Sequence, residues 1–112
     1  MVQLSAPLDV AFAAIADATR RGVLDRLGRG DASITELAGA FDMTLTGMKK
    51  HVRVLEDAGL VATEKVGRVR RCRLGPRRLD EERAWIAHYQ SMLEARYDRL
   101  GEFLERTRGD DA

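Results

Sequence analysis

The 112-residue sequence lacks the features that define several common protein classes. Its single cysteine, Cys72, cannot form an internal disulfide, and no apolar run reaches the roughly eighteen residues that a membrane span requires. Residues 1–9 have neither the basic start nor the long apolar stretch of a secretory signal. We therefore expect one small cytoplasmic domain, spanning residues 1–112, without membrane contact.

Motifs that carry chemistry are also scarce. The sequence contains no Gly-rich phosphate loop, no metal-ligand cluster and no nucleophile with an evident base. The acidic pair Glu81 and Glu82 stands at the start of a predicted helix, where it complements the helix dipole. The sequence thus argues against an enzyme and predicts neither a metal nor a cofactor.

The chain as a whole has almost no excess of one charge sign, but one part of it does. The chain has 19 basic and 18 acidic residues, for a net charge of +1, yet residues 43–75 contain 8 basic and 3 acidic residues. The two flanking parts are each slightly acidic. A nearly neutral protein therefore contains a basic module, which is the electrostatic footprint of a nucleic-acid partner.

Hydrophobic periodicity and capping residues predict four short helices in the first half of the chain. The first covers about residues 6–16, and the second begins after Asp17, whose side chain can cap it. Ser33 and Glu36 have the spacing of a capping box at the start of the third helix. Thr44 can cap a fourth helix, residues 44–58, and Gly59 can end it in a left-handed conformation.

Two β-branched segments and a long helix follow. Residues 61–66 and 69–74 flank Gly67 and predict a two-stranded hairpin, whereas residues 80–106 predict one helix of about 40 Å. The expected fold class is therefore mainly α with a small β-hairpin. We interpret it as a winged helix-turn-helix with about five helices and a two-stranded wing.

The polar face of the fourth helix is the feature that predicts function. Residues Thr46, Lys49, Lys50 and Arg53 recur at helical spacing opposite the apolar face, and Gly47 beside them would let the backbone approach DNA closely. The hairpin turn adds Lys65, Arg68, Arg70 and Arg71. Both elements that a winged helix presents to a duplex are thus basic.

Two alternative interpretations compete with DNA binding. The stripe on the fourth helix can be a solvated surface, and a winged helix can lose DNA and become a protein-interaction module. The basic side chains favour DNA, because a protein-binding descendant has no reason to keep a polar and basic reading face. The DNA-reading part would then be about residues 33–75.

The last helix predicts a homodimer. Its apolar residues follow a heptad-like spacing that Arg96 interrupts, and a domain of this size cannot cover them alone. The alternative is that it packs only on the N-terminal helix of its own chain. We expect helix 80–106 to use one edge for that contact and the other to pair with a second copy, so that the reading helices lie about 34 Å apart on an inverted-repeat operator. The predicted interface residues are Leu8, Phe12, Trp85, Ile86, Tyr89, Met92, Leu93, Leu100 and Phe103.

Three stretches of the sequence resemble the ArsR family of bacterial winged-helix repressors: residues 12–21 (FAAIADATRR), 34–38 (ITELA) and 50–61 (KHVRVLEDAGLV). The resemblance covers nearly the whole chain. It implies a homodimeric regulator, usually a repressor of its own operon, which binds double-stranded DNA and is released by a signal. The family's base-contacting helix maps onto residues 44–53, which makes candidates of Thr44, Thr46, Gly47, Lys49, Lys50 and His51, with Arg68 and Arg70 on the wing.

The chain departs from the family where the family binds metal. Residues 36–42 carry no cysteine, and the final helix offers His88 alone where relatives have Asp and His pairs. Because a zinc site needs three or four ligands, we predict a member that does not sense metal. Three ways of controlling the protein stay open. They are a redox role for Cys72, an unidentified small-molecule effector near Trp85 and Tyr89, and control by protein concentration alone.

Overall fold

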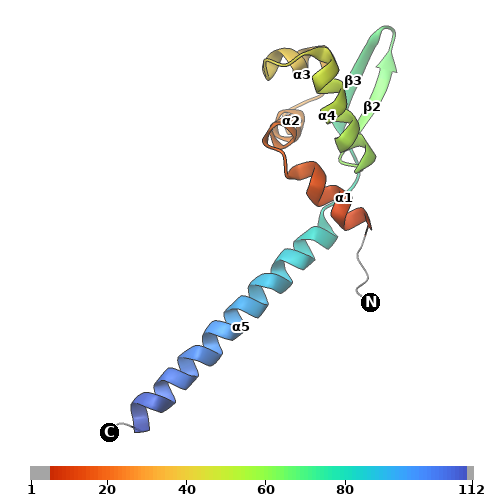
Figure 1. The fold of residues 1–112 in the computed structure, drawn as a ribbon. Helices are drawn as coiled ribbons and strands as arrows, with labels where there is room; N and C mark the ends of the chain where they lie inside the picture. Colours follow the sequence, from red (N-terminus) through yellow and green to blue (C-terminus); the bar gives the residue numbers. More distant parts are fainter. Residues whose placement is uncertain (1–5, 111–112) are drawn as a thin grey trace. The chain divides into compact units, whose positions relative to one another are not determined.

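Helices α1 (Ala6–Ile15) and α2 (Ala18–Gly28) form at the predicted positions in a computed structural model that describes residues 6–110 (Figure 1). The Asp17 carboxylate accepts the backbone N–H of Arg20 at 3.0 Å, so Asp17 caps α2 as predicted. Gly30, at φ +153°, follows the end of α2 and turns the chain. The helices bury Ala11, Ala14 and Val23.

Helices α3 (Ile34–Ala40) and α4 (Leu45–Asp57) form the predicted helix-turn-helix. The Ser33 and Thr44 hydroxyls accept the N–H groups of Glu36 and Gly47 at 3.0 Å, so each hydroxyl caps its helix. Asp42, at φ 51°, supplies the tight turn between the two helices.

The end of α4 is fixed by a glycine motif. Gly59 has φ +76°, and its N–H donates to the Glu56 carbonyl while the Leu60 N–H donates to the Leu55 carbonyl, both at 2.9 Å. These two bonds are those of a Schellman cap, which satisfies the last carbonyls of the helix. The predicted left-handed residue at Gly59 is confirmed.

The sheet has one strand more than the predicted hairpin. Strands β2 (Val61–Val66) and β3 (Val69–Leu74) pair antiparallel around Gly67, and β1 (Ala32–Ser33) pairs with the outer edge of β3, giving the order β1-β3-β2. The predicted two-stranded wing is therefore confirmed, and the sheet contains in addition the short strand β1, which the sequence did not predict. Two residues are too few for any periodicity, and their pairing depends on tertiary contact.

The core lies where α2, α3, α4 and β3 meet. Its largest fully buried apolar side chains are Leu37, Met48, Leu55, Val23 and Cys72. Met48, Val52 and Leu55 occupy the inner face of α4, as the periodicity predicts, so the opposite face of α4 is left to solvent. Figure 1 shows α4 beside the β2–β3 hairpin.

The chain divides into two compact units after Leu79, and the second is helix α5 (Asp80–Asp110). This helix has 31 residues and runs to 110, beyond the predicted end at 106, with Asp80, Glu81 and Glu82 in its first turn. Among residues 6–110, no helix combines the length and the hydropathy that a membrane crossing requires.

Candidate nucleic-acid interface

The exposed face of α4 carries the polar stripe that the sequence predicts. Thr46, Lys49, Lys50 and Arg53 are all exposed, and the capping Thr44 is exposed just before them. The helix thus presents hydroxyl, ammonium and guanidinium groups on a rigid element. Such groups bind phosphates and base edges.

A groove of about 890 Å³ separates α4 from the β2–β3 hairpin. Five cationic side chains line it from both sides, together with the Glu56 and Asp57 side chains at the C-terminal end of α4. The structure therefore brings much of the predicted basic stripe and much of the predicted basic wing to one concave surface. The five cations are Lys49 and Arg53 from α4, and Lys65, Arg68 and Arg70 from the hairpin.

A chain of hydrogen bonds connects the wing to α4 across this groove. Arg70 Nη1 donates to Thr63 Oγ1 at 2.9 Å, and the Thr63 hydroxyl donates to Glu56 Oε2 at 2.5 Å. The Arg70 guanidinium is thereby held through Nη1, and its other N–H groups take no part in this series of hydrogen bonds. The sequence did not identify Thr63 or Glu56, because their proximity depends on a strand register that it does not specify.

Arg71 lies on the other face of the hairpin from Arg70, since neighbouring residues of a strand point to opposite faces. It pairs with Glu64 across the ladder, and Glu64 in turn contacts Arg73 at 3.7 Å. The groove lining does not include Arg71. Three of the four wing residues predicted from charge therefore line the groove, and Arg71 does not.

Gly47 has a local reason to be glycine besides the approach of DNA. A Cβ built at this position would lie 3.1 Å from the Thr44 hydroxyl and 3.2 Å from Met43 Cγ. A side chain here would crowd the cap of α4. The proximity of its backbone to DNA stays a prediction.

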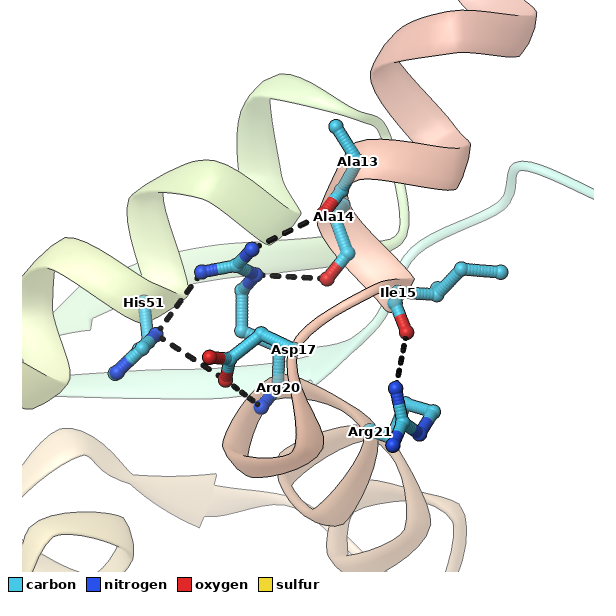
Figure 2. A network of polar contacts seen from close by, with 7 residues as sticks. All are labelled: Ala13, Ala14, Ile15, Asp17, Arg20, Arg21 and His51. Atoms are coloured by element: carbon cyan, nitrogen blue, oxygen red, sulfur yellow. Dashed lines mark hydrogen bonds and ion pairs between the residues drawn. The ribbon is translucent and has the colours of Figure 1, made fainter.

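His51 lies in a polar network with α2 instead of in the groove (Figure 2). Its Nδ1 is 3.2 Å from Arg20 Nη1 and 3.9 Å from Asp17 Oδ2, and its side chain is 23% exposed. The pKa of Asp17 is lowered, mainly by the Arg20 N–H that it accepts and further by the nearby charge of the Arg20 guanidinium, while desolvation opposes them. Arg20 is not among the site residues predicted from the sequence, where a cationic residue just after a helix break is the one signal that could have indicated it.

Cys72 is fully buried in the core on β3. Burial raises the pKa of its thiol, and the Glu56 carboxylate raises it further, whereas Arg70 acts in the opposite direction. A thiol with a raised pKa forms little of the reactive thiolate at neutral pH. The geometry therefore favours a small buried hydrophobic residue over the redox role that the sequence leaves open.

The candidate interface residues on α5 form an apolar face. Tyr89 is 49% exposed, Leu100 is 54% exposed, and Trp85 stacks on Tyr89 with ring centroids 6.0 Å apart. Leu93 is half-buried, as are Leu8 and Phe12 on α1. The exposed large apolar residues of α5 are Trp85, Ile86, Tyr89, Met92, Tyr97, Leu100, Phe103 and Leu104.

No group of three or more His, Cys, Asp or Glu side chains that could hold a metal ion occurs within the part of the chain that the structure describes. The geometry instead defines a class of protein. A helix-turn-helix flanked by a three-stranded sheet, with a basic groove between its second helix and the hairpin, is a winged helix-turn-helix.

Comparisons with known proteins specify the family. Residues 15–64 match the model of a helix-turn-helix domain. The transcriptional regulator Rv2034 of Mycobacterium tuberculosis is 31% identical over 98 residues, covering 80% of this chain and 92% of the relative. The crystal structure of an ArsR family transcriptional regulator is 45% identical and superimposes with a TM-score of 0.73, covering 84% of this chain and 97% of that one.

A third relative, the transcriptional repressor SdpR of Bacillus subtilis, is 27% identical over 78 residues, covering 70% of this chain and 87% of the repressor. The chain belongs to the ArsR family of winged helix-turn-helix transcriptional regulators. The resemblance found in the sequence is thereby confirmed, and the family is one of transcription regulators and not of enzymes.

Proposed function

We propose that the protein is a repressor that binds an inverted-repeat operator as a homodimer, with α4 in the major groove and the β2–β3 hairpin on the adjacent backbone or minor groove. The observation that carries this proposal is the groove whose cations come from both α4 and the hairpin. A duplex is the partner that such a surface fits, because its phosphates lie at regular spacing beside the base edges.

The proposed contacts divide into two kinds. Side chains near the start of α4 are placed to reach base edges, whereas those of the hairpin are placed to reach phosphates. His51 and Arg71, which lie outside the groove, contribute less in this proposal than the sequence suggested. The contacts are Thr44, Thr46, Gly47, Lys49, Lys50 and Arg53 from α4 and its cap, and Lys65, Arg68 and Arg70 from the hairpin.

The apolar face of α5 supports the dimer. A helix of 31 residues with half-exposed aromatic and aliphatic side chains at heptad-like spacing pairs readily with a copy of itself. Twofold symmetry would place two α4 helices on successive major grooves about 34 Å apart, which requires an operator with inverted half-sites.

Repression is supported by steric reasoning and by one relative. A small dimer bound at a promoter occludes the polymerase, and SdpR, which resembles this chain, is named a repressor. Autoregulation is the simplest arrangement for a regulator of this size. The operator would then lie upstream of its own gene.

The experiment that tests the proposal is an anisotropy titration of the purified protein against the DNA upstream of its gene and against scrambled DNA. We expect a preference of about a thousandfold for the upstream DNA at one dimer per site. If roughly six phosphates are contacted, the logarithm of the affinity should fall with the logarithm of salt concentration at a slope of about −5. Weak binding of both duplexes with a flat salt slope would instead indicate a protein-interaction module.

Lys49→Ala tests base readout within the same assay. We expect it to weaken specific binding by about 1–3 kcal/mol and non-specific binding much less, because a base contact discriminates between sequences. Arg73→Ala is the matched control, since Arg73 lies on the hairpin beside Glu64 and outside the groove lining. Equal losses on both duplexes from Lys49→Ala would remove Lys49 from base readout.

A further inference from the structure

Two arginines of α2 bind the carbonyl end of α1. Arg20 Nε donates to the Ala14 carbonyl at 2.7 Å and Nη2 to the Ala13 carbonyl at 3.0 Å, while Arg21 Nη1 donates to the Ile15 carbonyl at 2.8 Å (Figure 2). The last carbonyls of a helix have no partner within it and lie at the negative end of its dipole. The two guanidinium groups therefore cap α1.

Arg20 also reaches α4, and this second contact distinguishes it from Arg21. Its Nη1 lies 3.2 Å from Nδ1 of His51, a residue 31 positions away and half-buried in the middle of α4. The Asp17 carboxylate accepts the Arg20 backbone N–H and lies 3.9 Å from the same His51 nitrogen. A single guanidinium thus connects α1, α2 and the helix that the proposed function places in the major groove.

A hydrogen bond at this contact requires one particular tautomer of His51. An arginine side chain has five donors and no acceptor, so a hydrogen bond between Nη1 and Nδ1 requires Nδ1 to accept. For this hydrogen bond to form, His51 has to be the neutral tautomer that carries its proton on Nε2. A proton on Nδ1 would oppose one donor to another and would face the Asp17 carboxylate, whose Oδ2 is 3.9 Å away.

We propose that Arg20 is a positioning residue for DNA recognition, which acts through the neutral His51 ring to set the orientation of α4 against α1 and α2. The inner face of α4 is held by Met48, Val52 and Leu55, and apolar burial of this kind is not directional. A hydrogen bond to a charged donor is directional and supplies the orientation that burial leaves unspecified. The proposal rests on the proposed function, because the orientation of α4 matters only if α4 reads DNA.

The first test is the tautomer of His51, which does not depend on DNA. Long-range ¹H–¹⁵N correlation spectra of the full-length protein at neutral pH should show an unprotonated Nδ1 and a protonated Nε2 for His51. In Arg20→Met that preference should weaken, because the donor to Nδ1 is gone. A proton resident on Nδ1 in the wild-type protein would overturn the proposal.

The second test is a double-mutant cycle on operator affinity. Arg20→Met and His51→Ala should each weaken specific binding about fivefold to tenfold, and the double variant should lose no more than the larger single loss, since both changes remove one interaction. Non-specific affinity and the salt slope should stay unchanged, because Arg20 contacts no phosphate in this proposal. His51→Asn, which keeps an acceptor near the position of Nδ1, should recover part of the loss.

Arg21→Met is the matched control. It removes one hydrogen bond to the same end of α1, where Arg20 makes two, and within residues 6–110 no hydrogen bond joins Arg21 to α4; it should therefore lower stability somewhat less than Arg20→Met and leave operator affinity near the wild-type value. Additive losses in the cycle, or equal affinity losses from Arg20→Met and Arg21→Met at matched thermal stability, would refute the positioning role. Absence of specific binding by the wild-type protein would refute the proposed function itself, and the two failures are therefore distinguishable.

Discussion

Asp17 illustrates how one carboxylate serves two structural purposes. It caps α2 through the Arg20 N–H, and it places a negative charge beside both Arg20 and His51. Its pKa is lowered for these reasons. A carboxylate whose pKa is lower in the folded state stabilises the fold above its unfolded pKa, and that stabilisation is lost as the pH falls through the folded value.

Asp17→Asn isolates this contribution, because asparagine can cap a helix but cannot titrate there. The wild-type protein should be more stable than the variant at neutral pH. The advantage should disappear as the pH falls below the ordinary value of 3.8, a loss that urea unfolding of both proteins at matched pH values would measure. The other carboxylates titrate in both proteins and cancel in the difference. A stability difference that does not change with pH would show that the charge of Asp17 contributes nothing.

The wing depends on a side chain that the sequence does not mark as functional. Thr63→Val removes the link between Arg70 and Glu56 while keeping a β-branched residue that suits the strand. We expect DNA affinity to fall by about 0.5–1 kcal/mol, because Arg70 loses the contact that orients it. Anisotropy titrations of the variant would show the loss.

Two further variants determine whether Thr63 acts through Arg70. In an Arg70→Ala background, Thr63→Val should have no further effect on affinity. Thr107→Val serves as a control, since Thr107 is an exposed threonine whose hydroxyl donates to the Phe103 carbonyl within α5. A full loss in the Arg70→Ala background would mean that Thr63 contacts DNA by itself.

Individual elements were predictable to the extent that local signals define them. Asp17, Ser33 and Thr44 cap helices at the positions that their side chains predict, since each needs only a backbone N–H three residues away. The two-residue strand β1, the contact between Thr63 and Arg70 and the contact between Arg20 and His51 were not predictable. Each depends on chain segments brought together by the tertiary fold, and short polar segments carry no periodic signal of that.

The candidate site was predictable in composition but not in grouping. The charge count between residues 43 and 75 identified the basic residues, yet it could not separate Arg70 from Arg71, which point to opposite faces of one strand. Nor could it show that His51, on the same helix as Lys49 and Lys50, would lie against α2. The type of a residue indicates which chemistry its side chain can perform. The strand register and the packing of the helices decide on which surface that side chain lies.

For the molecule as a whole, α5 determines the predicted assembly. Leu100→Glu places a charge on the apolar face of α5 and should convert the dimer to a monomer, because burying an unpaired carboxylate costs far more than one apolar contact supplies. Sedimentation equilibrium would measure the change, and operator affinity should fall with it. Ser91→Glu, at the position opposite the heptad seam, is the matched control and should leave the dimer intact. A wild-type protein that sediments as a monomer would refute the α5 dimer.

Ser33 belongs to two structures at once, since it pairs with Arg71 in the sheet and caps α3 through the Glu36 N–H. Its neighbour Ala32 pairs with Cys72, in the middle of the strand that returns from the wing. A shift of this pairing by one residue would turn Ser33 to the opposite face and uncap α3. We therefore expect the hairpin and the cap of α3 to unfold together, so that hydrogen exchange of the β3 amides and of the first turn of α3 should show similar protection.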